Sequence, residues 1–212
     1  MVTIQDLEGF SKTFIHKIRE VTHHKHKVYD IILVKTLFST LKVYTIYLNR
    51  TYVSTSKIDG NGLFASRKIK KGEIITFYPP HYILHYKNGN HYPNCPVNQL
   101  DSDIVKEKQL KFNESIFRYR FNINSEYSIC GDPRITDCPT FLGHMINDGA
   151  RGHSTRKNYN HKDEEIYNKI LFFVNNSYAQ YVGNSYMVII ASKDIEKDEE
   201  ILMPYGYDYW ID

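Results

Sequence analysis

From Arg50 onward the sequence is divided into short runs of alternating or continuous apolar residues, with turn-forming residues between them. Eight runs stand out: TYVSTSKI, GLFASRKI, EIITFYPP, RYRFNI, EYSIC, SYAQYV, YMVIIASKDI and EILMPY. β-Branched and aromatic side chains dominate the runs, while Gly, Pro, Asn and Asp separate them, which is typical of short strands. The pattern predicts a mainly β domain of small curved sheets over residues 50–212, with a hairpin turn at Gly183-Asn184.

Residues 1–49 have a different pattern. Apolar residues recur there at helical spacing, which predicts an amphipathic helix over about residues 5–21: Leu7, Phe10, Phe14, Ile15, Ile18 and Val21. We therefore expect a helical cap ahead of the β domain. Two long stretches, 87–114 and 151–171, interrupt the strand pattern. We interpret them as insertions containing short helices, because stretches of this length usually bind or regulate something.

Composition excludes several classes of protein. The net charge of +3 in 212 residues, with basic and acidic residues interspersed, does not indicate a nucleic-acid surface. Cys95, Cys130 and Cys138 contain no CxxC pair, so cysteine alone makes neither a disulfide framework nor a zinc site. No signal peptide and no membrane span are evident. We expect an intracellular protein without metal, in the nucleus or in a viral or host-cell compartment.

The turn Gly60-Asn61-Gly62, followed by Leu63, lies between two strand-like runs. It is either a tight hairpin turn or a place where the backbone closely approaches a ligand, since glycine leaves room for both. No GxGxxG precedes a helix, so the turn does not indicate a dinucleotide fold.

Polar residues interrupt the apolar segment FLGHMIND at His144, Asn147 and Asp148. Buried polar groups need partners. The segment therefore holds either an internally satisfied core histidine with a capping Asn, or groups that bind the polar end of a ligand.

The segment EEILMPYGYDYW places Tyr205, Tyr207 and Tyr209 around Gly206, with no adjacent Ser, Cys or His to act as a nucleophile. The tyrosines either lie on a solvent-facing strand edge or form a channel that orients a reactant without attacking it.

Taken together and in this order, these three segments resemble the SET-domain protein lysine methyltransferases, over roughly Tyr52 to Trp210. The chain resembles a minimal, zinc-free form, of the kind seen in some large DNA viruses and protists. The resemblance implies S-adenosylmethionine as methyl donor and no metal. It implies that Gly60–Leu63, His144 and Asn147 bind the donor. Asp148 stands where the family more often has His, and its backbone would face the adenine.

The same resemblance implies roles for the aromatic residues. Tyr205 matches the catalytic tyrosine, and Tyr207 would line the lysine channel. Trp210 would close over the adenine. Tyr127 and Tyr181 fall at channel positions, although core packing explains either equally well. The expected substrate is a lysine-containing protein or peptide such as a histone tail, which the acidic stretch 194–200 would attract.

The alternative function is a SET-like module that has lost activity and binds peptides as a scaffold. Asp148 and Pro79-Pro80 depart from the family pattern and favour this alternative, whereas an intact Tyr205 argues for an enzyme. The sequence leaves open the substrate protein, the number of methyl groups added and the oligomeric state. It predicts no direct nucleic-acid or membrane partner.

Overall fold

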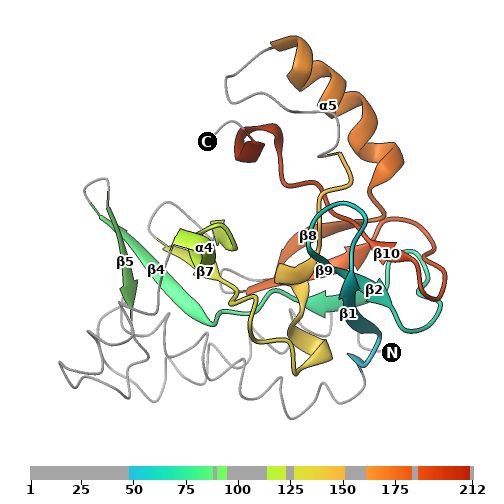
Figure 1. Ribbon diagram of the computed structural model, residues 1–212, viewed down its shortest axis with the longest axis horizontal. Helices are drawn as coiled ribbons and strands as arrows, with labels where there is room; N and C mark the ends of the chain where they lie inside the picture. Colours follow the sequence, from blue (N-terminus) through green and yellow to red (C-terminus); the bar gives the residue numbers. More distant parts are fainter. Residues whose placement is uncertain are drawn as a thin grey trace.

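A computed structural model of the protein describes residues 48–87, 90–94, 114–122, 127–150, 161–182 and 186–210. These residues form a mainly β structure of small antiparallel sheets, which confirms the predicted fold class (Figure 1). The helical cap expected over residues 1–49 lies outside the described residues, apart from its last two positions. Residues 95–113 of the first predicted insertion also lie outside them.

Three sheets carry the strands. The first has the order β1-β2-β10, with β1 (Thr51–Thr55), β2 (Asn61–Ala65) and β10 (Glu200–Ile201). The second has the order β3-β9-β8, with β3 (Ile74–Phe77), β9 (Tyr186–Ala191) and β8 (Ser177–Val182). The third has the order β5-β4-β7-β6, with β5 (Asn90–Asn94), β4 (Tyr82–Lys87), β7 (Tyr127–Cys130) and β6 (Arg120–Asn122). Each of the eight predicted runs contains a strand, and β8 and β9 form the expected hairpin.

The sequence interpretation did not include the hairpin of β4 and β5, which lies where an insertion was expected to begin, at residue 87. Lys87 pairs with Asn90, and the two residues between them in the sequence are Asn88-Gly89. Asn-Gly between two β-prone runs is the strongest local signal for a hairpin. The Asn-Gly signal was present in the sequence, but the strands on either side were not predicted because they contain many polar residues.

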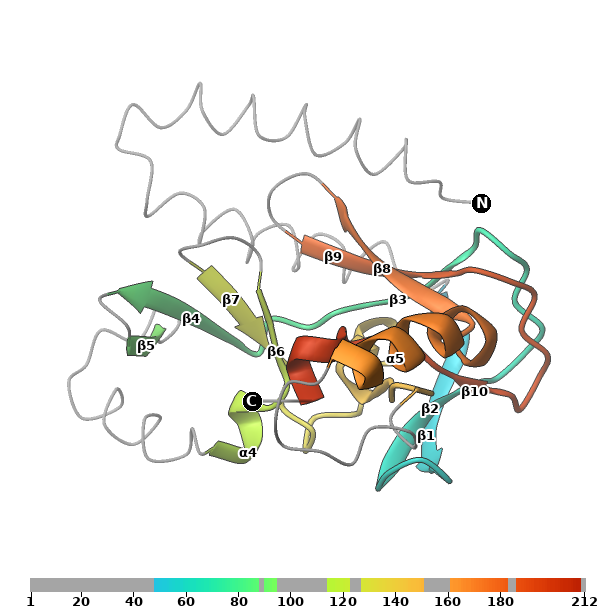
Figure 2. The ribbon, with the colours of Figure 1, turned by 90° about the horizontal axis from the view of Figure 1, so that it is seen from above.

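Among the described residues, helices are few and, apart from one, short. They are α4 (Glu114–Phe117), α5 (His161–Val174) and the 3₁₀-helices η2 (Pro139–Phe141), η3 (Gly143–Met145) and η5 (Tyr207–Trp210). Helix α5 occupies the second predicted insertion and continues past its expected end to Val174. In both ribbon views α5 lies beside the C-terminal segment, and it contacts η5 (Figures 1 and 2). No described helix is long and apolar enough to cross a membrane.

The main core joins the first two sheets to the segment 141–148. Twelve buried residues form it: Leu63, Ala65, Ile69, Ile75, Leu142, Met145, Ile146, Ile189, Ala191, Ile195, Ile201 and Met203. The side chain of Thr76 in β3 fixes the start of that segment, because its hydroxyl donates to the Thr140 carbonyl at 2.8 Å and accepts from the Leu142 N–H at 3.0 Å. The FLGHMIND segment is therefore held against strands from two sheets.

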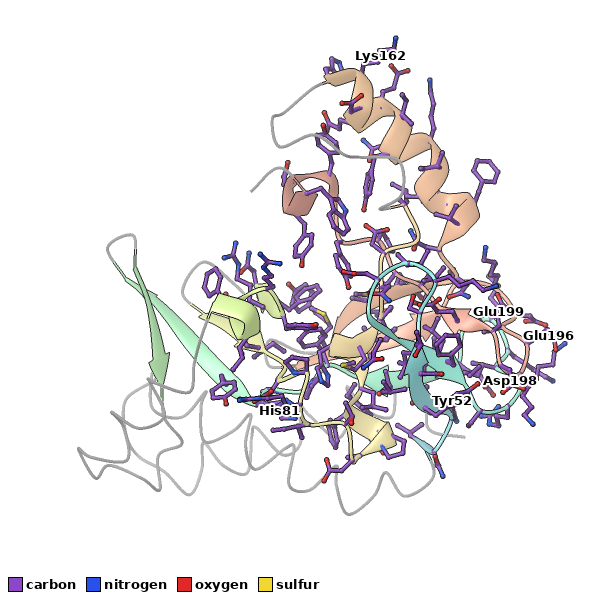
Figure 3. All side chains as sticks on the ribbon, viewed as in Figure 1. Tyr52, His81, Lys162, Glu196, Asp198 and Glu199 are labelled. Carbon is purple, nitrogen blue, oxygen red and sulfur yellow. The ribbon has the colours of Figure 1, made fainter. Side chains whose placement is uncertain are left out.

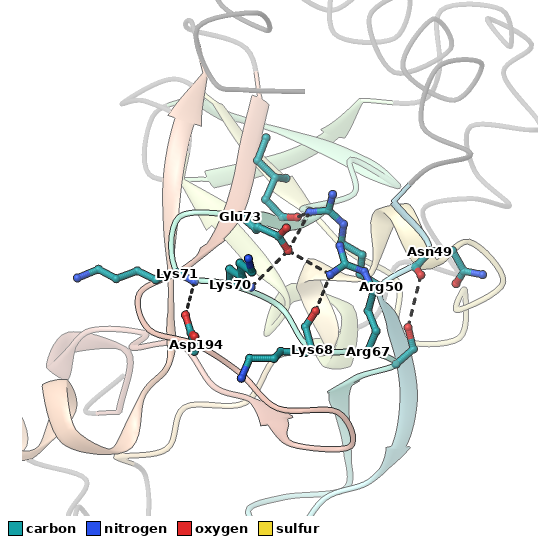
Figure 4. Close-up of polar contacts among 10 residues, drawn as sticks. Asn49, Arg50, Arg67, Lys68, Lys70, Lys71, Glu73 and Asp194 are labelled. Atoms are coloured by element: carbon teal, nitrogen blue, oxygen red, sulfur yellow. Dashed lines mark hydrogen bonds and ion pairs between the residues drawn. The ribbon is translucent and has the colours of Figure 1, made fainter. Parts of the chain in front are cut away.

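A partly buried carboxylate ties the beginning of β1 to β3. Glu73 lies 3.2 Å from the guanidinium of Arg67 and 3.9 Å from that of Arg50, which also donates to the Ile74 carbonyl (Figure 4). Burial lowers the pKa of Arg50, and the nearby Glu73 opposes this effect. Nearby, the Lys71 N–H donates to Asp194 at 2.9 Å. These contacts hold the strands next to the Gly60–Gly62 turn in a fixed arrangement.

Candidate active site

Asn147 lies at the meeting point of the turn at Gly60–Gly62 and the C-terminal strand. Its side-chain amide is within hydrogen-bonding distance of the carbonyls of Asp59 at 3.1 Å and Asn61 at 3.2 Å. It also lies 3.3 Å from Oε1 of Glu200. Three acceptors therefore converge on an amide that has only two protons to donate.

The backbone of Asn147 is part of the same crossing. Asn147 forms a parallel bridge with Leu202, and its carbonyl accepts from the Met203 N–H at 3.0 Å. Residues more than fifty positions apart are thus fixed side by side. This arrangement brings the turn, the FLGHMIND segment and the C-terminal tyrosines to one place.

Gly62 lies in close approach to the side chain of Glu200. A Cβ built on Gly62 would lie 2.2 Å from Oε1 of Glu200. The carboxylate of Glu200 therefore lies directly over the backbone of the turn, beside the Asp59 and Asn61 carbonyls. This is a concentration of acceptors that suits an ammonium group, such as the amine of a methionine moiety.

Tyr205 lies next to this crossing. Its hydroxyl donates to the carbonyl of Ile146, the residue before Asn147, and its side chain packs against the main core. Trp210 stacks on the Tyr205 ring with centroids 5.8 Å apart and an interplanar angle of 11°. Tyr209 meets the same ring edge-on at 4.7 Å. The hydroxyl of Tyr205 is thus fixed within one residue of Asn147.

Asp148 is buried and bonds to the C-terminal segment through its side chain. Its Oδ2 accepts from the Tyr205 N–H at 3.1 Å, from the Trp210 indole N–H at 3.1 Å and from the Tyr167 hydroxyl at 2.6 Å. Its Oδ1 accepts from the Ala150 N–H at 2.9 Å. The sequence analysis considered only the backbone of Asp148 and missed this role of the carboxylate.

Other aromatic hydroxyls surround Tyr205. Tyr78 is buried, and its hydroxyl donates to the Tyr119 carbonyl at 2.7 Å. Burial raises the pKa of Tyr78 well above its usual value, and the nearby Tyr205 and Tyr209 add to the effect. The Tyr78 phenol therefore stays neutral at physiological pH, so it can orient a reactant but cannot act as a charged base.

Sequence reasoning did not select Tyr78, Tyr209 or Tyr167. Tyr78 was within the quoted run EIITFYPP and Tyr209 within the C-terminal tyrosine cluster, so position near a motif was an available signal. Tyr167 had no such signal, because only the packing of α5 brings it to the site.

His144 lies buried behind the site, among the rings of His81, Tyr78 and Tyr119. Its Nε2–H donates to the Asp132 carbonyl at 3.1 Å, and its Nδ1 has no hydrogen-bond partner. Burial, with a contribution from the neighbouring His81, lowers the pKa of His144 to about 4. His144 is therefore a neutral core residue in this structure, and contact with a donor stays a prediction.

The remaining predicted residues are distributed around the site. Leu63 is fully buried in the main core, so contact with a donor stays a prediction for this residue. Tyr207 packs against Tyr167 in a small cluster under α5, with ring centroids 6.0 Å apart. Tyr181 is 45% exposed, and its hydroxyl donates to the Asn122 carbonyl. Tyr127 begins β7, but its side chain is not among those described. Their roles in a lysine channel stay predictions, and Tyr209 is the tyrosine that packs directly on Tyr205.

No metal centre is evident in the described parts of the chain. No three His, Cys, Asp or Glu side chains there are grouped as metal ligands. Burial raises the pKa of the Cys130 thiol to about 12, so that this group is inert at neutral pH.

Comparison with known proteins agrees with this geometry. The model of the SET domain matches residues 60–206. No protein with a curated description matches the sequence. The crystal structure of a candidate histone methyltransferase from Plasmodium falciparum is similar at 19% identity and a TM-score of 0.40, covering 76% of this chain and 96% of that one. This structural likeness is too low to carry an argument about function.

Proposed function

The chain belongs to the SET-domain family, and on that basis we propose that it is an S-adenosylmethionine-dependent protein lysine N-methyltransferase. One observation carries the proposal: the Gly60–Gly62 turn, Asn147 and the hydroxyl of Tyr205 converge through direct hydrogen bonds. These are the three elements that the family's reaction requires together.

The acceptors around Asn147 support a binding place for the methionine end of the donor. The carbonyls of Asp59 and Asn61 and the carboxylate of Glu200 would accept from its ammonium group. Asn147 would turn its amide toward the donor's carboxylate. Trp210, stacked on Tyr205, would cover the adenine.

S-Adenosylmethionine supplies a methyl group on a sulfonium, which a neutral lysine amine displaces in line. Lysine has an ordinary pKa of about 10.4, so the site must favour its neutral form. Exclusion of water by Tyr78, Tyr205 and Tyr209 would lower the pKa of the lysine amine by desolvation. The Tyr205 hydroxyl and nearby carbonyls would orient its nitrogen, which is catalysis by positioning.

The substrate we propose is a lysine in a basic protein segment such as a histone tail. The C-terminal strand begins in an acidic turn that contains Glu196, Asp198 and Glu199 (Figure 3). Negative charge there would increase the encounter rate with a basic peptide.

The test is transfer of labelled methyl groups from S-adenosylmethionine to a panel of core histones and co-purifying proteins. We expect saturable transfer by the wild type and a loss of at least about tenfold in rate for Tyr205→Phe, or ~1.4 kcal/mol of barrier. Tyr178→Phe is the matched control, since this tyrosine is 41% exposed on β8. Equal rates for wild type and Tyr205→Phe would remove the catalytic role from Tyr205.

Calorimetry with S-adenosylmethionine separates the enzyme from an inactive SET-like scaffold. An enzyme with an intact donor site gives a saturable binding heat that Asn147→Ala weakens. A chain that gives no saturable heat and transfers no methyl group is a scaffold, and the proposed activity is then wrong.

A further inference from the structure

Helix α5 reaches the candidate active site through one side chain. Tyr167 is the buried residue of the helix, and it packs with Ala150 and Tyr207. Ile170, Leu171 and Val174 lie on the same face of α5, at the spacing of neighbouring helical turns. This apolar face fixes the helix against the C-terminal segment and fixes the position of the Tyr167 hydroxyl.

The hydroxyl of Tyr167 is bonded on both sides. It donates to Oδ2 of Asp148 at 2.6 Å and accepts from the Gly206 N–H at 3.0 Å. The pKa of Tyr167 is raised by burial and by the hydrogen bond to Asp148, so the hydroxyl keeps its proton as a donor.

The same carboxylate oxygen also accepts from the Tyr205 N–H and from the indole of Trp210. Three hydrogen bonds therefore hold the C-terminal segment in place. The N–H of Tyr205 and the indole of Trp210 donate to Asp148, and the N–H of Gly206 donates to Tyr167. Gly206 lies in the turn between Tyr205 and Trp210 and has a φ of +93°. This conformation is unfavourable for a residue that has a side chain.

We propose that Asp148 and Tyr167 are positioning residues: together they hold Tyr205 and Trp210 in the geometry that methyl transfer requires. Helix α5 thereby braces the C-terminal segment over the site. The inference rests on the proposed function in that Tyr205 acts in catalysis and Trp210 covers the donor. The geometric part of the inference stands on the hydrogen bonds alone.

The chain offers a direct readout, because Trp210 is its single tryptophan. Fluorescence excited where tyrosine does not absorb reports the surroundings of this one side chain. Tyr167→Phe removes the hydroxyl without changing the ring, and Asp148→Asn replaces an acceptor oxygen by an amide of equal size. Tyr52→Phe is the matched control, since Tyr52 also donates to an aspartate, Asp198, at 3.0 Å, but at an exposed position (Figure 3).

We expect Tyr167→Phe to red-shift Trp210 emission and increase its quenching by acrylamide, at a temperature where circular dichroism reports a folded protein. We also expect a loss of about tenfold in kcat, because a catalytic group displaced from its productive geometry loses transition-state stabilisation. Asp148→Asn should have the larger effect on both quantities, since it disturbs more of the contacts. Tyr52→Phe should change neither.

A purely structural role would lower the melting temperature but leave the Trp210 spectrum and kcat of the folded variant unchanged, and that result would overturn the proposal. If Asp148→Asn does not fold, Tyr167→Phe decides the question alone. If the wild type transfers no methyl group, the proposed function is wrong. The fluorescence comparison still decides whether Asp148 and Tyr167 hold Trp210 in position.

Discussion

The neutral state of His144 makes the stability of the protein depend on pH in a defined way. His144 is buried, and its pKa is lowered to about 4 from an ordinary value near 6.5. Between these two values the unfolded chain binds a proton at this position and the folded chain does not. The free energy of unfolding therefore rises with pH through this window and falls on acidification.

The magnitude follows from the two pKa values. A difference from 6.5 to about 4 corresponds to about 3 kcal/mol of stability, present above about pH 6.5 and lost by about pH 4. The neighbouring Asp132 does not obscure the effect, because hydrogen bonds from Arg134 lower the pKa of its carboxyl to about 2 and it stays ionised throughout.

Urea unfolding of the wild type and His144→Gln at several values between about pH 7.5 and pH 4.5 measures the effect. Gln has a side-chain amide that can still donate to the Asp132 carbonyl but does not titrate. We expect the wild type to be the more stable at neutral pH and the two curves to converge by about 2–3 kcal/mol as the pH falls. Parallel curves across the range would show that His144 is not held neutral by the fold.

Three further substitutions test the packing around the site. Gly131→Ala would place a Cβ 2.3 Å from that of His144; we expect a loss of about 3 kcal/mol in urea unfolding, and a loss under about 0.5 kcal/mol would contradict the packing. Gly62→Ala would place a Cβ 2.2 Å from Oε1 of Glu200; we expect calorimetry to give about tenfold weaker binding of S-adenosylmethionine, and unchanged affinity would exclude this turn from the donor site. Glu73→Gln removes a partly buried negative charge between two guanidinium groups, of which that of Arg67 is exposed; we expect a loss of about 1–2 kcal/mol in the free energy of unfolding, and a neutral result would show that the network contributes little.

The strands could be predicted because their pattern is local. Runs such as YMVIIA and SYAQYV carry β-branched and aromatic residues over the length of a strand, and β9 and β8 form there. Residues 187–191 of β9 are all buried, which fits the continuous apolar run of a strand that is covered on both faces. Local patterns of this kind need no knowledge of the rest of the chain.

The hairpin of β4 and β5 was not predicted, although the signal for it was also local. The strand residues HYILHYK and NHYPN contain many His, Asn and Lys residues, and this composition resembles a loop. The Asn-Gly dipeptide between them specified the turn regardless of that composition. The turn residues therefore indicated this hairpin better than the hydrophobicity of its strands did.

The candidate site also contains residues that the sequence could predict and residues that it could not. The motif residues Asn147 and Tyr205 were identified by sequence, and the structure brings them together. The contact of Tyr167 with Asp148 joins an inserted helix to a motif 19 positions earlier in the chain, at a hydrogen-bond length of 2.6 Å. No periodicity or motif encodes such a pairing, because it depends on how α5 packs against the C-terminal segment.

The departure at Asp148 therefore has a physical explanation that the sequence did not suggest. An imidazole has two nitrogens and, when neutral, accepts only one hydrogen bond, whereas the carboxylate of Asp148 accepts from Tyr167, Tyr205 and Trp210 on one oxygen and from Ala150 on the other. A histidine here could not satisfy these donors, and buried N–H groups without partners are destabilising by about 1–3 kcal/mol each. The aspartate and the helix that supplies Tyr167 thus require each other. This mutual dependence is the reason to interpret Asp148 as a working part of the site, and it argues against the decay of an ancestral pocket.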